Sequence, residues 1–82
     1  MDEQPKWLLI KQKMTLYHLT NAWMVERFYT RGVPIRDYNL YRFLRGERNR
    51  SDDYRIIADT AESILASYEE WLALEKSTKE KA

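Results

Sequence analysis

Residues 32–46 read GVPIRDYNLYRFLRG, and this stretch decides which fold the chain can adopt. It begins and ends with the two glycines of the sequence. Because glycine just past a helical segment is a common helix terminator, Gly32 and Gly46 are predicted to end two successive helices. Pro34 disfavours α geometry at the residue before it, so the chain after Gly32 is predicted to be extended or turning. The stretch therefore predicts two helices joined by a turn.

A short third helix is predicted over about residues 38–45, with Asp37 as its N-terminal cap. At about 100° per residue, Leu40, Phe43 and Leu44 fall on one side of it and predict a face that packs on the core. A helix this short is unstable alone, so that face must dock on other helices. The opposite side carries two tyrosines and two arginines, which are Tyr38, Tyr41, Arg42 and Arg45. Asn39 lies at the border between the two sides.

Helical periodicity also precedes this stretch. Pro5 is a favoured first helical residue. The apolar stripe that follows it has three- and four-residue spacing and comprises Trp7, Ile10, Met14 and Tyr17. Thr20 or Asn21 is the predicted cap of a second helix, which Gly32 ends. Neither glycine nor proline separates the two segments, so the sequence leaves open whether they form one helix or two.

A fourth helix is predicted to start near Ser51, Asp52 or Asp53, any of which can cap it, and to end at about residue 74. Its apolar stripe comprises Ile57, Ala61, Ile64, Leu65, Tyr68, Trp71 and Leu72. Residues 76–82 lack an apolar anchor and are predicted to form a flexible charged tail, which leaves residues 1–75 as a single helical domain. The predicted fold class is all-α, a compact bundle of four helices.

Composition supports this class and excludes several others. The 82 residues suffice for one small domain, and two Gly and two Pro leave few turns for an all-β architecture. The absence of Cys excludes thiolate chemistry, and a single His excludes a multi-histidine metal site. Without convergent titratable groups or a phosphate-binding glycine loop, we expect no enzyme activity, no cofactor and no metal. No apolar run approaches the about 18–20 residues of a membrane span, and no signal peptide is recognisable, so we expect a cytoplasmic protein.

Charge is distributed unevenly along the chain. Every Arg lies in residues 27–55, where eight Arg face four acidic residues, and every Lys lies outside that segment. Residues 56–82 are acidic instead, with six acids and three Lys. The planar fork of arginine suits phosphates and guanine edges, whereas lysine offers a point charge. This segregation indicates a nucleic-acid-binding face; a solvated arginine-rich loop, or arginines paired with acidic neighbours, is the alternative interpretation.

A family resemblance points the same way. Residues 40–48, LYRFLRGER, followed by a capped helix with Ile56, Ile57, Ala58 and Ala61, resemble the second half of a lambda-repressor-like helix-turn-helix domain. The resemblance extends over about residues 19–66 and is sharpest over residues 37–66. It implies a bundle of four or five helices in which the third enters the major groove and the second braces it across the backbone.

The resemblance also implies roles for individual residues. The stretch between the two glycines is about two residues longer than the family pattern, so the turn before the third helix is expected to be enlarged. By position, the residues implied to face the groove are Arg36, Tyr38, Asn39, Tyr41 and Arg42. Those implied to lie near phosphates are Arg45, Arg48 and Arg50.

Two functions fit these features. The first is a small DNA-binding transcriptional regulator of the phage or mobile-element type, whose arginine- and tyrosine-rich third helix binds double-stranded DNA. The second is a helical protein-interaction module whose same face binds an acidic protein partner. Charge alone does not separate them, because DNA and an acidic protein present similar potentials.

The end of the fourth helix is a candidate dimer interface. A helix over about residues 53–74 would span roughly 33 Å, more than three short helices readily cover. Its last two turns would then expose an apolar stripe that a second copy can bury. The predicted homodimer contacts are Tyr68, Trp71, Leu72 and Leu74. The alternative is that the first helix, with Trp7, covers this end.

Overall fold

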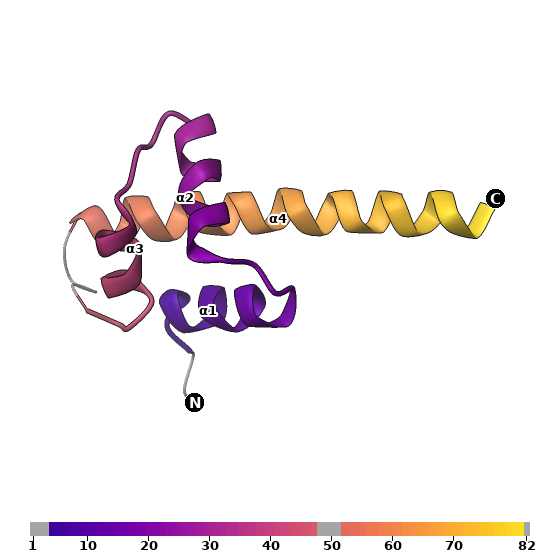
Figure 1. Cartoon of the computed structure of the whole chain (residues 1–82). Helices are drawn as coiled ribbons and strands as arrows, with labels where there is room; N and C mark the ends of the chain where they lie inside the picture. Colours follow the sequence, from indigo (N-terminus) through magenta and orange to yellow (C-terminus); the bar gives the residue numbers. More distant parts are fainter. Residues whose placement is uncertain (1–3, 48–51, 82) are drawn as a thin grey trace.

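Four α-helices pack around one core in the computed structural model, and the part of the chain that it describes contains no strand (Figure 1). The structure describes residues 4–47 and 52–81, the last five of these by their backbone alone. The helices are α1 (Lys6–Leu16), α2 (Asn21–Thr30), α3 (Asp37–Phe43) and α4 (Asp52–Lys81). The predicted all-α class is therefore confirmed.

A left-handed histidine separates α1 from α2, which the sequence left open as one helix or two. His18 has a φ of 57°. Its N–H donates to the carbonyl oxygen of Thr15 at 3.2 Å, and the N–H of Leu19 donates to that of Met14 at 2.8 Å. These two bonds define a Schellman motif, with histidine where glycine is usual. Thr20 then caps α2, because its hydroxyl oxygen accepts a hydrogen bond from an N–H of the first turn at 3.0 Å.

The same motif ends α2 and α3. Gly32 and Gly46 have φ angles of 75° and 81°. The N–H of the residue after each glycine donates to a carbonyl oxygen of the last helical turn, at 3.1 Å in both cases. Both glycines therefore end helices as predicted.

The start of α3 differs from the prediction. Arg36 occupies the N-cap position and Asp37 is the first helical residue, so Asp37 is not the cap. Its carboxylate still lies in the first turn, where the helix dipole favours negative charge. Residues 31–36 connect α2 to α3, a longer link than the about 3–4 residues of a tight helix-turn-helix, and this agrees with the enlarged turn that was expected. Ile35, only 7% exposed, anchors this connection in the core.

Helix α4 is longer than predicted. It continues to Lys81 rather than ending near residue 74, because no glycine or proline follows Gly46 to interrupt it. The segment predicted as a flexible tail is thus helical through residues 76–81. At about 1.5 Å per residue α4 spans roughly 45 Å. Its C-terminal half extends beyond the other three helices (Figure 1).

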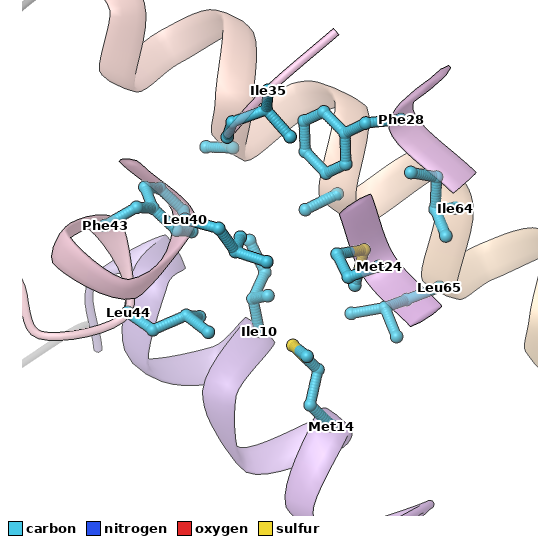
Figure 2. Packing of buried hydrophobic residues seen from close by; sticks show 12 residues of the cluster. Ile10, Met14, Met24, Phe28, Ile35, Leu40, Phe43, Leu44, Ile64 and Leu65 are labelled. Atoms are coloured by element: carbon cyan, nitrogen blue, oxygen red, sulfur yellow. The ribbon is translucent and has the colours of Figure 1, made fainter. Parts of the chain in front are cut away.

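The core lies where the four helices meet (Figure 2). Leu40, Phe43 and Leu44 of α3 are 0%, 3% and 8% exposed, so the predicted inner face of α3 is confirmed. The other buried apolar residues come from every helix and from the connection: Ile10, Met14, Met24, Phe28, Ile35, Ala58, Ala61, Ile64 and Leu65. Within the described ranges no polar or charged residue is buried, so the core is held by apolar packing.

Ion pairs between α1 and α4 show that these helices run parallel. Lys6 Nζ lies 3.2 Å from Asp59 Oδ1 and 3.0 Å from Glu62 Oε1, and these contacts raise the pKa of Lys6, with Glu62 contributing more. Two turns further along both helices, Lys13 Nζ lies 3.0 Å from Glu69 Oε1. All of these groups are substantially exposed, so the pairs fix the register more than they stabilise the fold.

The parallel arrangement decides what covers α4. Trp7 lies at the α3 end of the bundle, where a Cβ on Gly46 would be 2.7 Å from its Cζ2, and the backbone N–H of Trp7 donates to the Tyr54 hydroxyl at 3.3 Å. Trp7 therefore does not cover the C-terminal half of α4. The end of α1 reaches further along, since the rings of Tyr17 and Tyr68 lie 5.4 Å apart between centroids.

Candidate nucleic-acid interface

The outer face of α3 brings together four of the predicted site residues. Tyr38 and Tyr41 are 65% and 51% exposed, Arg45 is exposed and Arg42 is half-buried. Tyr38, Tyr41 and Arg42 lie on α3 opposite its buried face, and Arg45 lies in the turn that follows the helix. The predicted division of α3 into an apolar inner face and an arginine- and tyrosine-rich outer face is thus observed.

Each arginine on this face stacks on a tyrosine four residues before it. Arg42 Cζ lies 5.5 Å from the ring centroid of Tyr38, and Arg45 Cζ lies 5.4 Å from that of Tyr41. Arg45 Nη1 also donates to the Tyr41 hydroxyl at 3.4 Å. Such cation–π pairs contribute about 0.5–1 kcal/mol at exposed sites. The stacking orders both guanidinium groups while leaving them at the surface.

Glu47 joins the two arginines, a feature that the sequence analysis missed. Its Oε1 lies 3.2 Å from Arg42 Nε and its Oε2 lies 3.7 Å from Arg45 Nε. The turn at Gly46 places it there, because the Glu47 N–H donates to the Arg42 carbonyl oxygen at 3.1 Å. Both arginines therefore have an acidic neighbour, as the alternative interpretation of the charge pattern required. The sequence feature that predicts this contact is Gly46, because a helix-ending glycine turns the residue after it back towards the helix.

The remaining predicted residues lie at the edges of the face or outside the described residues. Arg36 is exposed and Asn39 half-buried, and both line a groove of about 470 Å³ between the α2–α3 connection and α4. Arg48 and Arg50 lie outside the described residues. At the opposite edge, Lys11 of α1 shares a groove of about 250 Å³ with Tyr41 and Arg45. The sequence analysis did not include Lys11 among the candidate site residues. The sequence feature that indicates its exposure is its position outside the apolar stripe of α1.

Comparison with known proteins leaves the family open: models of protein families, curated proteins and solved structures all gave no match. Within residues 4–47 and 52–76, no three His, Cys, Asp or Glu side chains gather in a way that would hold a metal ion. No helix in this part of the chain combines the length and apolarity needed to cross a membrane.

Proposed function

We propose that this protein binds double-stranded DNA through the outer face of α3, as a small transcriptional regulator of the phage or mobile-element type. The observation that carries the proposal is that face, where Arg42 and Arg45 are ordered by stacking on exposed tyrosines. A guanidinium can bond guanine O6 and N7 together, and a tyrosine hydroxyl can bond a phosphate. A face that only meets solvent more commonly presents Lys and Glu.

The residues divide into two roles in this proposal. Arg42, near the middle of the face, reads base edges together with Tyr38 and Tyr41, and Arg36 and Asn39 contact the groove at its border. Arg45, Arg48 and Arg50 contact phosphates. Docking a short helix in the major groove by such flanking phosphate contacts fixes register, while base contacts provide the specificity.

The Glu47 carboxylate must move away from the two arginines when DNA binds. Its carboxylate is within 3.2 Å of Arg42 Nε and would face the negatively charged phosphates or occupy the donors that read bases. DNA therefore exchanges the two Arg–Glu47 contacts for its own. Glu47→Gln should increase affinity for duplex DNA, because it keeps the shape of the side chain and removes the competing charge.

The test is titration of the protein with random and then selected duplex DNA at low and moderate salt. Binding should weaken steeply as salt rises, since each neutralised phosphate contributes about −0.9 to the slope of log K against log salt. Arg42→Ala should cost about 1–3 kcal/mol on a selected site, and Arg48→Ala should weaken all sequences about equally. Lys76→Ala, an exposed cation on α4 away from α3, is the matched control and should change little. Equal losses for Arg42→Ala and Lys76→Ala would refute the assignment, as would a loss for Arg42→Ala that is the same on random and on selected duplexes.

A second candidate function is binding of an acidic protein by the same face. The observation that favours it is that Arg42 and Arg45 already pair with a carboxylate, that of Glu47, at 3.2 and 3.7 Å. The two functions are distinguished by comparing the binding of this protein to polyglutamate and to duplex DNA at low salt. Binding of polyglutamate without binding of duplex DNA supports the second function. Binding of duplex DNA with a steep salt slope supports the first.

A further inference from the structure

The part of α4 that extends past α1 and α2 presents an apolar stripe to solvent. Trp71 is 52% exposed and Leu74 is 66% exposed. The last ion pair from α1 reaches Glu69, one turn before Leu74. Residues 70–75, here called the overhang, belong to the part of α4 that extends beyond α1 and α2, and only Leu72 among them is half-buried (Figure 1). Packing of this segment against a partner would remove its exposed apolar side chains from water.

A groove between α2 and α4 adjoins the overhang. This α2–α4 groove has a volume of about 430 Å³, and Trp23, Tyr68 and Trp71 form its aromatic lining. The Tyr68 ring lies between the two indoles, 5.5 Å from Trp23 and 5.8 Å from Trp71 between centroids. Trp71 belongs to both features, so groove and overhang make one continuous surface on one side of α4.

The groove is basic. Arg27 lies over the Trp23 ring at 5.9 Å; its Nη2 pairs with Glu26 Oε1 at 3.5 Å, while its Nε is buried with no hydrogen-bond acceptor among the described residues. Arg31 is fixed across the groove, where its guanidinium donates to the hydroxyls of Ser63 and Ser67 at 2.5 and 2.9 Å. A half-buried and an exposed guanidinium beside an aromatic lining favour a partner that brings an apolar side chain flanked by carboxylates.

The overhang has that chemistry. At about 100° per residue, Glu70 and Glu75 lie on either side of the stripe formed by Trp71 and Leu74. Both glutamates are exposed. The chain therefore carries, on one side of one helix, a basic aromatic groove and an acidic apolar segment that complement each other.

We propose that two copies of this protein form a two-fold symmetric dimer in which the overhang of each copy docks in the α2–α4 groove of the other. A two-fold axis makes both contacts at once, since each copy offers the same groove and the same overhang. Contact between overhangs alone would be too small, because Trp71 and Leu74 expose well under half of the about 800 Å² per partner that a stable interface buries. Inclusion of the groove enlarges the contact and pairs Glu70 and Glu75 with Arg27 and Arg31.

Variants that reverse the charges of the overhang or of the groove test this dimer. The experiment contains no DNA, so its result does not depend on the proposed function. Sedimentation velocity of the full chain over about 1–100 µM should show a mass that rises from monomer to dimer, which is the range of a micromolar Kd. The overhang variant Glu70→Lys/Glu75→Lys and the groove variant Arg27→Glu/Arg31→Glu should each stay monomeric, because like charges then face each other. An equimolar mixture of the two should form a heterodimer, because every contact again pairs opposite charges.

Two controls keep the outcome clear. Lys11→Glu reverses an exposed charge on α1 and should leave the dimer intact. Circular-dichroism melts establish that each variant is folded; if loss of the serine contacts unfolds Arg31→Glu, Arg27→Glu alone serves as the groove variant in the same mixture. A wild type that stays monomeric over the whole range overturns the proposal, and so does a mixture of two folded variants that does not associate.

Discussion

Replacing Gly46 by Ala should destabilise this protein more than the same change at Gly32. Both glycines have left-handed φ angles, 81° and 75°. An alanine at either position therefore incurs about 1–2 kcal/mol of backbone strain, offset by about 0.4–1 kcal/mol because alanine restricts the unfolded chain. The surroundings differ: a Cβ at Gly32 would meet no heavy atom within 4 Å, whereas a Cβ at Gly46 would lie 2.7 and 2.8 Å from two atoms of the Trp7 indole.

The size of the difference follows from the rigidity of that indole. Trp7 is half-buried against the core and cannot bend away from Gly46, so either the ring or the turn must shift. Overpacking of this kind costs about 1–3 kcal/mol. Gly32→Ala should therefore cost about 1 kcal/mol and Gly46→Ala about 2–4 kcal/mol. In a domain of this size 1 kcal/mol shifts Tm by about 4–8 °C, so the two variants should be clearly separated.

Thermal and urea unfolding, followed by circular dichroism, measure both costs. A third comparison isolates the clash: in a Trp7→Ala background, Gly46→Ala should cost no more than Gly32→Ala, because the strain of the left-handed backbone is all that is left. Equal losses at the two glycines in the wild-type background would refute the reasoning. So would a cost of Gly46→Ala that does not change when the Trp7 indole is removed.

Three further predictions concern other contacts. Leu44→Ala should lower the free energy of unfolding by about 2–5 kcal/mol in urea titration and weaken binding through unfolding alone; a fully stable variant would show that α3 is docked differently. His18→Gly should raise the stability by up to about 1 kcal/mol, because it relieves a left-handed side-chain residue, and a lower Tm would show that the imidazole makes a stabilising contact. Hydrogen bonds from Tyr17 and Lys13 hold the pKa of Glu69 below its ordinary value of 4.5, so this carboxylate stabilises the fold above that pH and the effect is lost as pH falls through the lowered pKa. The Tm gap between wild type and Glu69→Gln should accordingly be present at neutral pH and shrink below pH 4.5; a gap independent of pH would contradict it.

The features that sequence alone predicted correctly depend on local chemistry. Glycine has an intrinsic advantage at left-handed positions, so Gly32 and Gly46 mark helix ends whatever surrounds them. Thr20 likewise caps α2 through its own hydroxyl. The inner face of α3 follows from periodicity, because Leu40 and Phe43 are spaced to meet one neighbour.

The features that sequence did not predict depend on tertiary contacts or on weaker local preferences. Histidine populates the left-handed region more than most residues but far less than glycine, so His18 gave no clear signal for the break between α1 and α2. Glu47 is five residues from Arg42, a separation that does not bring side chains together on a helix; only the turn at Gly46 makes them neighbours. The apolar stripe predicts an end of α4 near residue 74, yet a helix ends at a breaker or a cap, and no glycine or proline is present there.

Tertiary contacts position α3 at both of its ends, and this explains how a long connection is compatible with an ordered outer face. Before α3, the connection is anchored by Ile35, which is 7% exposed. After α3, Gly46 lies against the Trp7 indole, and the Tyr54 ring packs on Phe43 at 5.2 Å between centroids. A helix of 7 residues has no independent stability, so its packing on α2, together with the contacts from α1 and α4, determines where its outer face points. The tight turn of a helix-turn-helix is one way to orient a short helix; here its packing on α2, the anchored connection and the contacts at its C-terminal end do so instead.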